Sequence, residues 1–115
     1  MDNIAAAQGR HMKISPIKGK LIADMVRNKD VGEAVTILKF SPKKGARIVL
    51  KVLNSAVANA QVKFPNIDVD DLFISRIYFD KAPYQKRFKP RARGRATRIL
   101  KRYSHVTIHL RERED

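Results

Sequence analysis

Cysteine is absent from the 115 residues of this chain. Without thiols the protein can form neither disulfides nor thiolate metal sites, so its stability must come from packing. A chain of this length buries about two thirds of the surface that it exposes when unfolded, which suffices for one modest core. We therefore expect a single domain over residues 1–115.

Long apolar runs are also missing. No stretch reaches the ~18 consecutive apolar residues of a membrane span, and the start, Met1–Ile4, has no basic segment followed by an apolar run. An Arg- and Ser-rich transit peptide is not apparent either. The sequence predicts no membrane partner, no secretory signal and no transit peptide.

Acidic residues are scarce, with 11 Asp and Glu against 25 Lys and Arg, a formal net charge of +14 and a pI near 10.6. Such an excess on a small chain indicates a polyanionic partner. The charge is concentrated, because residues 81–103 contain ten Lys or Arg and no acid. Residues 1–80 contain thirteen Lys or Arg and eight Asp or Glu, and residues 104–115 contain two Lys or Arg and three Asp or Glu. One segment of 23 residues therefore carries most of the excess.

Two helices are predicted in the first third of the chain. Ser15 followed by Pro16 is typical of an N-cap and a first helical position, and a helix is expected at about 16–27. Its apolar residues near helical spacing are Ile17, Leu21, Ile22, Met25 and Val26. Asp30 and Glu33 have the spacing of a capping box. They predict a short second helix with an apolar stripe formed by Ala34, Ile37 and Leu38.

A third helix is predicted at about 42–63, again after a Ser–Pro pair, Ser41-Pro42. Apolar residues recur there at three- and four-residue steps: Ala46, Val49, Leu50, Leu53, Val57 and Ala60. Its first half is crowded with cations, which oppose the helix dipole: Lys43, Lys44, Arg47 and Lys51. We interpret these cations as ligands for an external anion.

Three segments are strand-like, which together with the helices indicates an α+β domain. Residues 4–14 form a weak candidate, with Ile4, Met12 and Ile14 on one face. Residues 72–79 are rich in aromatic and β-branched side chains, but both faces are apolar and the buried one is undecided. Residues 106–111 alternate apolar and polar side chains, which predicts a half-buried strand.

Between the last two strands, residues 80–103 lack an apolar stripe. Cations occupy every second position, at Arg87, Lys89, Arg91, Arg93 and Arg95, so an extended chain presents them on one side. Two arms of ~11 residues at ~3.3 Å each would project roughly 35 Å, with a turn at Pro90 or Gly94. We interpret this arm as a hairpin that orders only when RNA phosphates neutralise it. A solvated basic loop or a localisation tag is the alternative.

Other candidate sites are weaker. Tyr84 and Phe88 either stack on unpaired bases or pack across the hairpin. His105 and His109 lie ~13 Å apart along a strand, too far to share one metal ion. The run Asp68, Asp70 and Asp71 lacks the Gly and Glu of a calcium loop and reads as a solvated turn. Since no nucleophile–base pair or phosphate-binding glycine loop stands out, we expect no enzyme activity, cofactor or small-molecule substrate.

Three stretches of the chain are similar to known sequences. They are Arg10-His11 with Ile14-Ser15-Pro16, Lys18, Leu21-Ile22-Ala23-Asp24 and Arg27; the run 51–60, KVLNSAVANA; and the run 90–107, from PRARGRA through Arg98-Ile99-Leu100-Lys101-Arg102 to Ser104-His105-Val106-Thr107. The chain thereby resembles the bacterial family of the twenty-second large-subunit ribosomal protein over nearly its whole length. One departure is Lys81-Ala82-Pro83, where many members have Gly before Pro.

The resemblance implies three helices packed on a three-stranded antiparallel sheet, with a long protruding β-hairpin at about 80–103. It further implies a structural protein that binds 23S rRNA, supports early assembly, contacts neighbouring ribosomal proteins and lines the nascent-peptide exit tunnel. The tunnel tip would comprise Gln85, Lys86, Arg87, Phe88, Lys89, Pro90 and Arg91. The expected rRNA-binding residues are Arg10, His11, Lys13, Lys18, Lys20, Lys43, Lys44, Lys86, Arg87, Lys89, Arg91, Arg93, Arg95, Arg98, Lys101 and Arg102.

The implied location is a cytoplasmic ribosome, with a plastid stroma as the alternative. Two rivals have the same charge: a nucleoid-type protein that binds duplex DNA, and an enzyme that acts on RNA.

Deletion of residues 85–95 is predicted to leave the domain folded, because this segment adds nothing to the apolar stripes. A thermal melt followed by circular dichroism should keep one cooperative transition. Loss of that transition would show that the arm belongs to the core.

Overall fold

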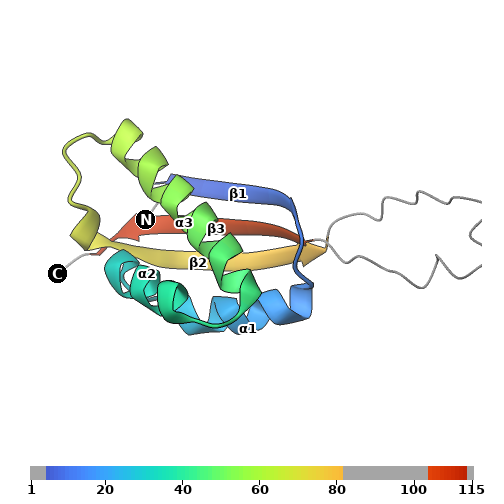
Figure 1. The fold of residues 1–115 in the computed structure, drawn as a ribbon. Coiled ribbons are helices and arrows are strands. Elements are labelled where there is room, and N and C mark those ends of the chain that lie inside the picture. The colour runs from blue at the N-terminus through green and yellow to red at the C-terminus, as the bar shows by residue number, and fades with distance from the viewer. Residues whose placement is uncertain (1–4, 82–103, 114–115) are drawn as a thin grey trace, which may run out of the picture.

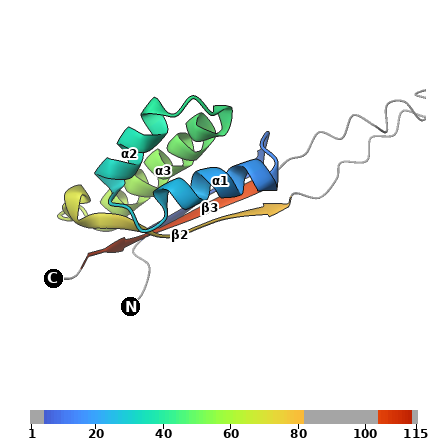
Figure 2. The same cartoon turned by 90° about the horizontal axis from the view of Figure 1, so that it is seen from below.

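The computed structural model of the chain describes residues 5–81 and 104–113, apart from the side chains of His11 and Lys81. Three helices lie on one face of a three-stranded antiparallel sheet (Figures 1 and 2). The elements are β1 (Ala5–Met12), α1 (Pro16–Val26), α2 (Val31–Phe40), α3 (Lys44–Lys63), the 3₁₀ turn η1 (Val69–Asp71), β2 (Leu72–Lys81) and β3 (Ser104–Glu112). The α+β class is confirmed, while the predicted hairpin at 82–103 lies outside the described residues.

The strand order is β1-β3-β2, so the last strand in sequence is central. Met12 and Lys81 are both register partners of Ser104, which places the three residues side by side across the sheet. We call this edge the Ser104 end. The chain leaves the sheet at Lys81 and returns at Ser104, where the two strands of the predicted hairpin would begin.

The core lies between the sheet and the three helices. Val49, Leu53 and Ala60 on the predicted stripe of α3 are fully buried. On β3, Val106, Ile108 and Leu110 are buried, as the alternation predicted. Thr107 on the other face is only 8% exposed, because β3 has a hydrogen-bonded strand on each side.

Strand β2 contains a bulge that explains its ambiguous sequence pattern. The register with β3 shifts between Ile74 and Arg76. The buried residues are therefore Leu72, Ile74 and Ile77, which do not follow a strict two-residue period. An extra residue in one strand reverses the alternation beyond it, so the sequence alone left the buried face undecided.

Helix α1 has the predicted cap and part of the predicted apolar face. The Ser15 hydroxyl accepts a hydrogen bond from the Lys18 amide at 3.3 Å, as expected. Of the apolar residues near helical spacing, Ile22 and Val26 are buried and Met25 packs on the core, whereas Ile17 and Leu21 are 69% and 55% exposed. The helix turns Gly19 toward the sheet instead, since that residue without a side chain permits close contact with the Phe79 ring.

Helix α2 begins after Asp30, as predicted, whereas the start of α3 is shifted. The Asp30 side chain makes no capping hydrogen bond to α2, so the predicted capping box is wrong. Helix α3 begins at Lys44 rather than at Pro42. The Ser41 hydroxyl accepts from the Lys43 amide at 3.3 Å and so caps a turn that precedes the helix.

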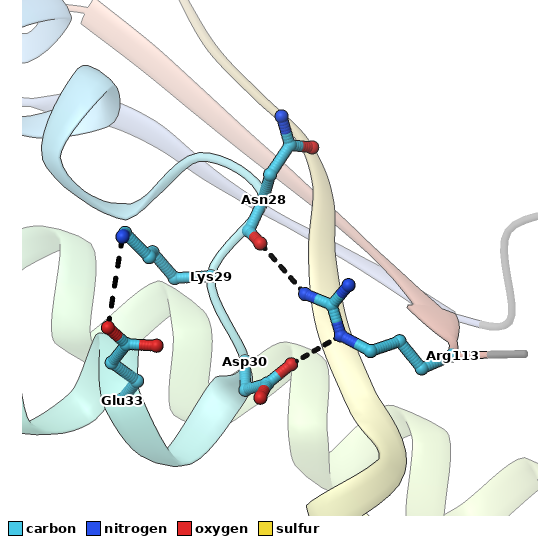
Figure 3. A network of polar contacts seen from close by, with 5 residues as sticks. All are labelled: Asn28, Lys29, Asp30, Glu33 and Arg113. Atoms are coloured by element: carbon cyan, nitrogen blue, oxygen red, sulfur yellow. Dashed lines mark hydrogen bonds and ion pairs between the residues drawn. The ribbon is translucent and has the colours of Figure 1, made fainter. Parts of the chain in front are cut away.

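The Asp30 side chain instead binds Arg113, the residue that follows β3 (Figure 3). Arg113 Nε donates to Asp30 Oδ1 at 2.6 Å, and Arg113 Nη2 donates to the Asn28 carbonyl at 2.8 Å. Asn28 has φ 64°, a left-handed conformation that Asn tolerates better than most residues. Its amide donates to the Ile74 carbonyl at 2.9 Å. These contacts fasten the α1–α2 turn to the edge strand β2 and to the residue that follows β3.

Two glycine substitutions should shift stability in opposite directions. A Cβ atom on Gly19 would lie 2.5 Å from Phe79 Cδ2, whereas one on Gly32 in α2 would meet nothing within 4 Å. We expect Gly19→Ala to lower the free energy of unfolding by about 1–3 kcal/mol through overpacking. Gly32→Ala should raise it by about 0.5–1 kcal/mol through helix propensity. Urea titrations measure both; a neutral Gly19→Ala would contradict the close contact.

Candidate nucleic-acid interface

Segments distant in sequence converge on Ile14 at the Ser104 end. The Ser104 hydroxyl donates a buried hydrogen bond to the Ile14 carbonyl at 2.6 Å. On another side, a Cβ atom on Gly45 would overlap the Ile14 Cδ1 methyl, so the start of α3 packs directly on this residue. The β1–α1 connection, the start of α3 and the start of β3 thus meet where the chain enters and leaves residues 82–103.

Exposed lysines surround this junction. They are Lys13 beside Ile14, Lys18 and Lys20 in the first turns of α1, and Lys43 and Lys44 at the start of α3. Within residues 5–81 and 104–113, the ion pairs are Arg27–Asp24, Lys29–Glu33 and Arg113–Asp30, and none involves these lysines. We call the five lysines the basic end. Its charge is uncompensated within the described structure.

The two helix starts strengthen the positive potential of the basic end. Neither α1 nor α3 has an acidic residue in its first turn. Lys43 is the N-cap of α3 and makes no side-chain capping hydrogen bond. The first amides of a helix carry partial positive charge, which an anion stabilises and a lysine opposes. Phosphate groups are therefore suited to this surface.

Most described acidic residues lie elsewhere. At the opposite end of the sheet, where Leu72 pairs with Glu112, the 3₁₀ turn η1 and the start of α2 supply carboxylates. These acids are Asp30, Glu33, Asp68, Asp70, Asp71 and Glu112. Asp24 is paired with Arg27, and Asp80 on β2 is the acid nearest the Ser104 end. The described domain is thus polarised, with cations where residues 82–103 join it.

The predicted rRNA-binding residues divide into three sets. Lys13, Lys18, Lys20, Lys43 and Lys44 gather at the basic end. Arg10 is exposed on the sheet face opposite the helices, where its Nε donates to Gln8 Oε1 at 3.4 Å. The third set lies outside the part of the chain that the structure describes. It comprises the side chain of His11 and the arm cations Lys86, Arg87, Lys89, Arg91, Arg93, Arg95, Arg98, Lys101 and Arg102. The predicted tunnel tip, Gln85 to Arg91, also lies outside it.

Sequence reasoning missed cations on the same sheet face as Arg10. Arg76 is exposed and Arg111 is half-buried there. The face of Arg76 could not be predicted, because the bulge in β2 breaks the alternation that shows which side chains share a face. Arg47 and Lys51, noted in the sequence, are exposed along α3 beyond the basic end.

Other site types find little support among residues 5–81 and 104–113. This part of the chain holds no group of three or more side chains that could bind a metal ion. The acidic run forms the predicted turn, in which Asp68 Oδ1 accepts from the Asp70 amide at 2.9 Å. The described helices are all too short or too polar to cross a membrane.

Comparisons of the chain with a family model and with individual proteins indicate the same family. The family described as ribosomal protein L22p/L17e matches residues 7–111. A protein of Syntrophobacter fumaroxidans is 51% identical over 107 residues, covering 93% of this chain and 96% of its own length. Proteins of Clostridium novyi and Syntrophotalea carbinolica are 51% and 53% identical, covering 95% of this chain and 97% and 98% of their own. All three are named large ribosomal subunit protein uL22.

Replacement of the N-cap lysine should stabilise the free protein. Lys43→Ser supplies a capping hydroxyl and removes a cation from a positive helix end, so the free energy of unfolding should rise by about 1 kcal/mol. Urea denaturation measures the change. The control is Lys39→Ser in the last turn of α2, where a cation is favourable and its loss should be slightly destabilising. A destabilised Lys43→Ser variant would show that this lysine supports folding itself.

Proposed function

The chain belongs to the ribosomal protein L22p/L17e family, and we propose that it is a structural constituent of the large ribosomal subunit that binds 23S rRNA. The family is structural and non-enzymatic. The observation that carries the proposal is the gathering of five exposed lysines at the Ser104 end, where the arm joins the domain.

Binding would use two connected parts. The basic end contacts phosphates at the surface of the folded rRNA, with the first amides of α3 beside the lysines. The arm, with ten Lys or Arg over residues 81–103, passes between rRNA segments. Each neutralised phosphate releases condensed counterions, which supplies most of the binding free energy. Since both parts start at the Ser104 end, one approach of the domain engages both.

The tip of the arm, residues 85–91, would line the exit tunnel and contact the nascent peptide. Support comes from the family resemblance and from the antiparallel pairing of Lys81 with Ser104, which brings the two ends of the arm together. An arm that reaches through the rRNA contacts more than one of its domains, so binding early in assembly would help to fix their arrangement. Neighbouring ribosomal proteins are further partners. The bacterial sources of the relatives support a cytoplasmic ribosome rather than a plastid one.

The affinity for rRNA should fall steeply with salt and depend on the basic end. Each phosphate contact contributes ~0.7–0.9 to the slope of log affinity against log salt. We expect Lys43→Gln with Lys44→Gln to reduce the slope by about 1.4–1.8, because two contacts are lost. Filter binding to structured 23S rRNA fragments at several salt concentrations measures the slope.

The matched control is Lys63→Gln, which removes an exposed lysine from the opposite end of α3. Its slope should equal that of the unchanged protein. A random DNA duplex at physiological salt tests the nucleoid alternative and should bind more weakly than the rRNA fragments. The proposal would be contradicted if the affinity for the rRNA fragments did not change with salt concentration, or if the DNA duplex bound with equal affinity.

A further inference from the structure

The sheet face opposite the helices is covered by no described element (Figure 2). Its side chains alternate with the buried ones and belong to all three strands. They are Gln8 and Arg10 of β1; Phe73, Arg76, Tyr78 and Asp80 of β2; and His105, Thr107, His109 and Arg111 of β3. We call this surface the open face. Its centre combines flat rings with arginines, which is unusual for a surface that contacts only water.

Three planar groups lie together at that centre. The rings of Tyr78 and His109 are stacked, with centroids 6.1 Å apart and an angle of 24° between their planes. The guanidinium carbon of Arg76 lies 5.6 Å from the centroid of the Tyr78 ring. Tyr78 is 37% exposed, so part of its ring is available to a ligand. We call this cluster of Tyr78, His109 and Arg76 on two paired strands the platform.

The charges around the platform are mostly positive. Arg10, Arg76 and Arg111 are opposed on the open face by one described acid, Asp80, and none of the three arginines belongs to a described ion pair. Arg10 lies on β1 between Gly9 and Met12, the register partners of Val106 and Ser104, so it extends the positive charge of the open face toward the Ser104 end. On β1 a strand of phosphates could approach this face past Arg10, whereas on β2 Asp80 lies between Tyr78 and the Ser104 end.

We propose that the open face binds an unpaired rRNA nucleotide, with its base stacked on the Tyr78 ring and its phosphates held by Arg76 and Arg10. This inference rests on the proposed function and adds a second mode of contact to it. Aromatic rings on a sheet bind single-stranded bases through stacking, whereas duplex bases offer no free face.

The same surface fits a protein partner less well. The most exposed large apolar side chains lie off the open face, on α1, α2, α3 and the residue after α3: Ile17, Leu21, Phe40, Val62 and Phe64. Tyr and Arg are common at protein interfaces, but the buried centre of such an interface is mostly apolar. Among the described residues, the open face exposes Tyr78 and arginines and no further large apolar side chain, which favours a ligand that is both planar and anionic.

The test compares two substitutions of one ring. Tyr78→Phe keeps the stacking surface and should bind rRNA fragments within about twofold of the unchanged protein. Tyr78→Leu keeps apolar bulk but removes the π surface, so affinity should fall about fivefold or more. The loss should be the same at every salt concentration, because stacking neutralises no phosphate. The control is Phe40→Leu, an exposed aromatic residue on α2, which should change nothing.

A second measurement locates the contact directly. Ultraviolet crosslinking of the complex followed by trypsin should place a nucleotide adduct on the peptide 77–81, which contains Tyr78. This readout uses the unchanged protein and therefore holds even if Tyr78→Leu folds poorly, which circular dichroism would reveal.

The outcomes separate this inference from the function on which it rests. The inference that Tyr78 stacks on a base would be overturned if a folded Tyr78→Leu variant bound rRNA with full affinity. A reduced salt slope for that variant, or the absence of an adduct on peptide 77–81, would overturn it as well. If Lys43→Gln with Lys44→Gln still weakened binding in those cases, the proposed function would stand. Failure of the unchanged protein to bind rRNA fragments would overturn both.

Discussion

The buried hydrogen bond from the Ser104 hydroxyl to the Ile14 carbonyl joins the last strand to the segment before the first helix. A buried carbonyl left without a donor costs about 1–3 kcal/mol, so this contact strongly favours one arrangement. With Gly45 packed on Ile14, it sets the base of the arm beside the starts of α1 and α3. The gathering of lysines at the Ser104 end depends on this junction, because the lysines come from three separate segments.

The same junction concentrates lysines that belong to no ion pair within residues 5–81 and 104–113. Lysines at helix starts oppose the helix dipole, and the arm adds ten cations without an acid. A ligand that binds only the folded state stabilises that state. RNA phosphates would therefore both hold the protein and relieve the repulsion that its own sequence creates. The distribution is better suited to a ribonucleoprotein assembly than to a protein that functions alone.

The two surfaces of the domain suit different parts of a nucleic acid. The basic end offers amides and ammonium groups, which recognise phosphates and fix position. The open face offers the stacked rings of Tyr78 and His109 with Arg76 beside them, which suit an unpaired base. Together they would select a place where an rRNA strand leaves its duplex close to a phosphate-rich groove.

Local signals in the sequence determined the extent of α1 and most of α3, the existence of the three strands and the concentration of charge in residues 81–103. Capping residues, apolar periods and charge runs act over a few residues and can be read directly. Tertiary structure alone decided that α1 turns Gly19 toward the sheet and leaves Ile17 and Leu21 exposed, since Gly19 meets Phe79 far along the chain. It likewise decided that Asp30 binds Arg113 instead of capping α2. The order β1-β3-β2 and the shared face of Arg10 and Tyr78 also came from pairings between distant residues, which no local pattern encodes.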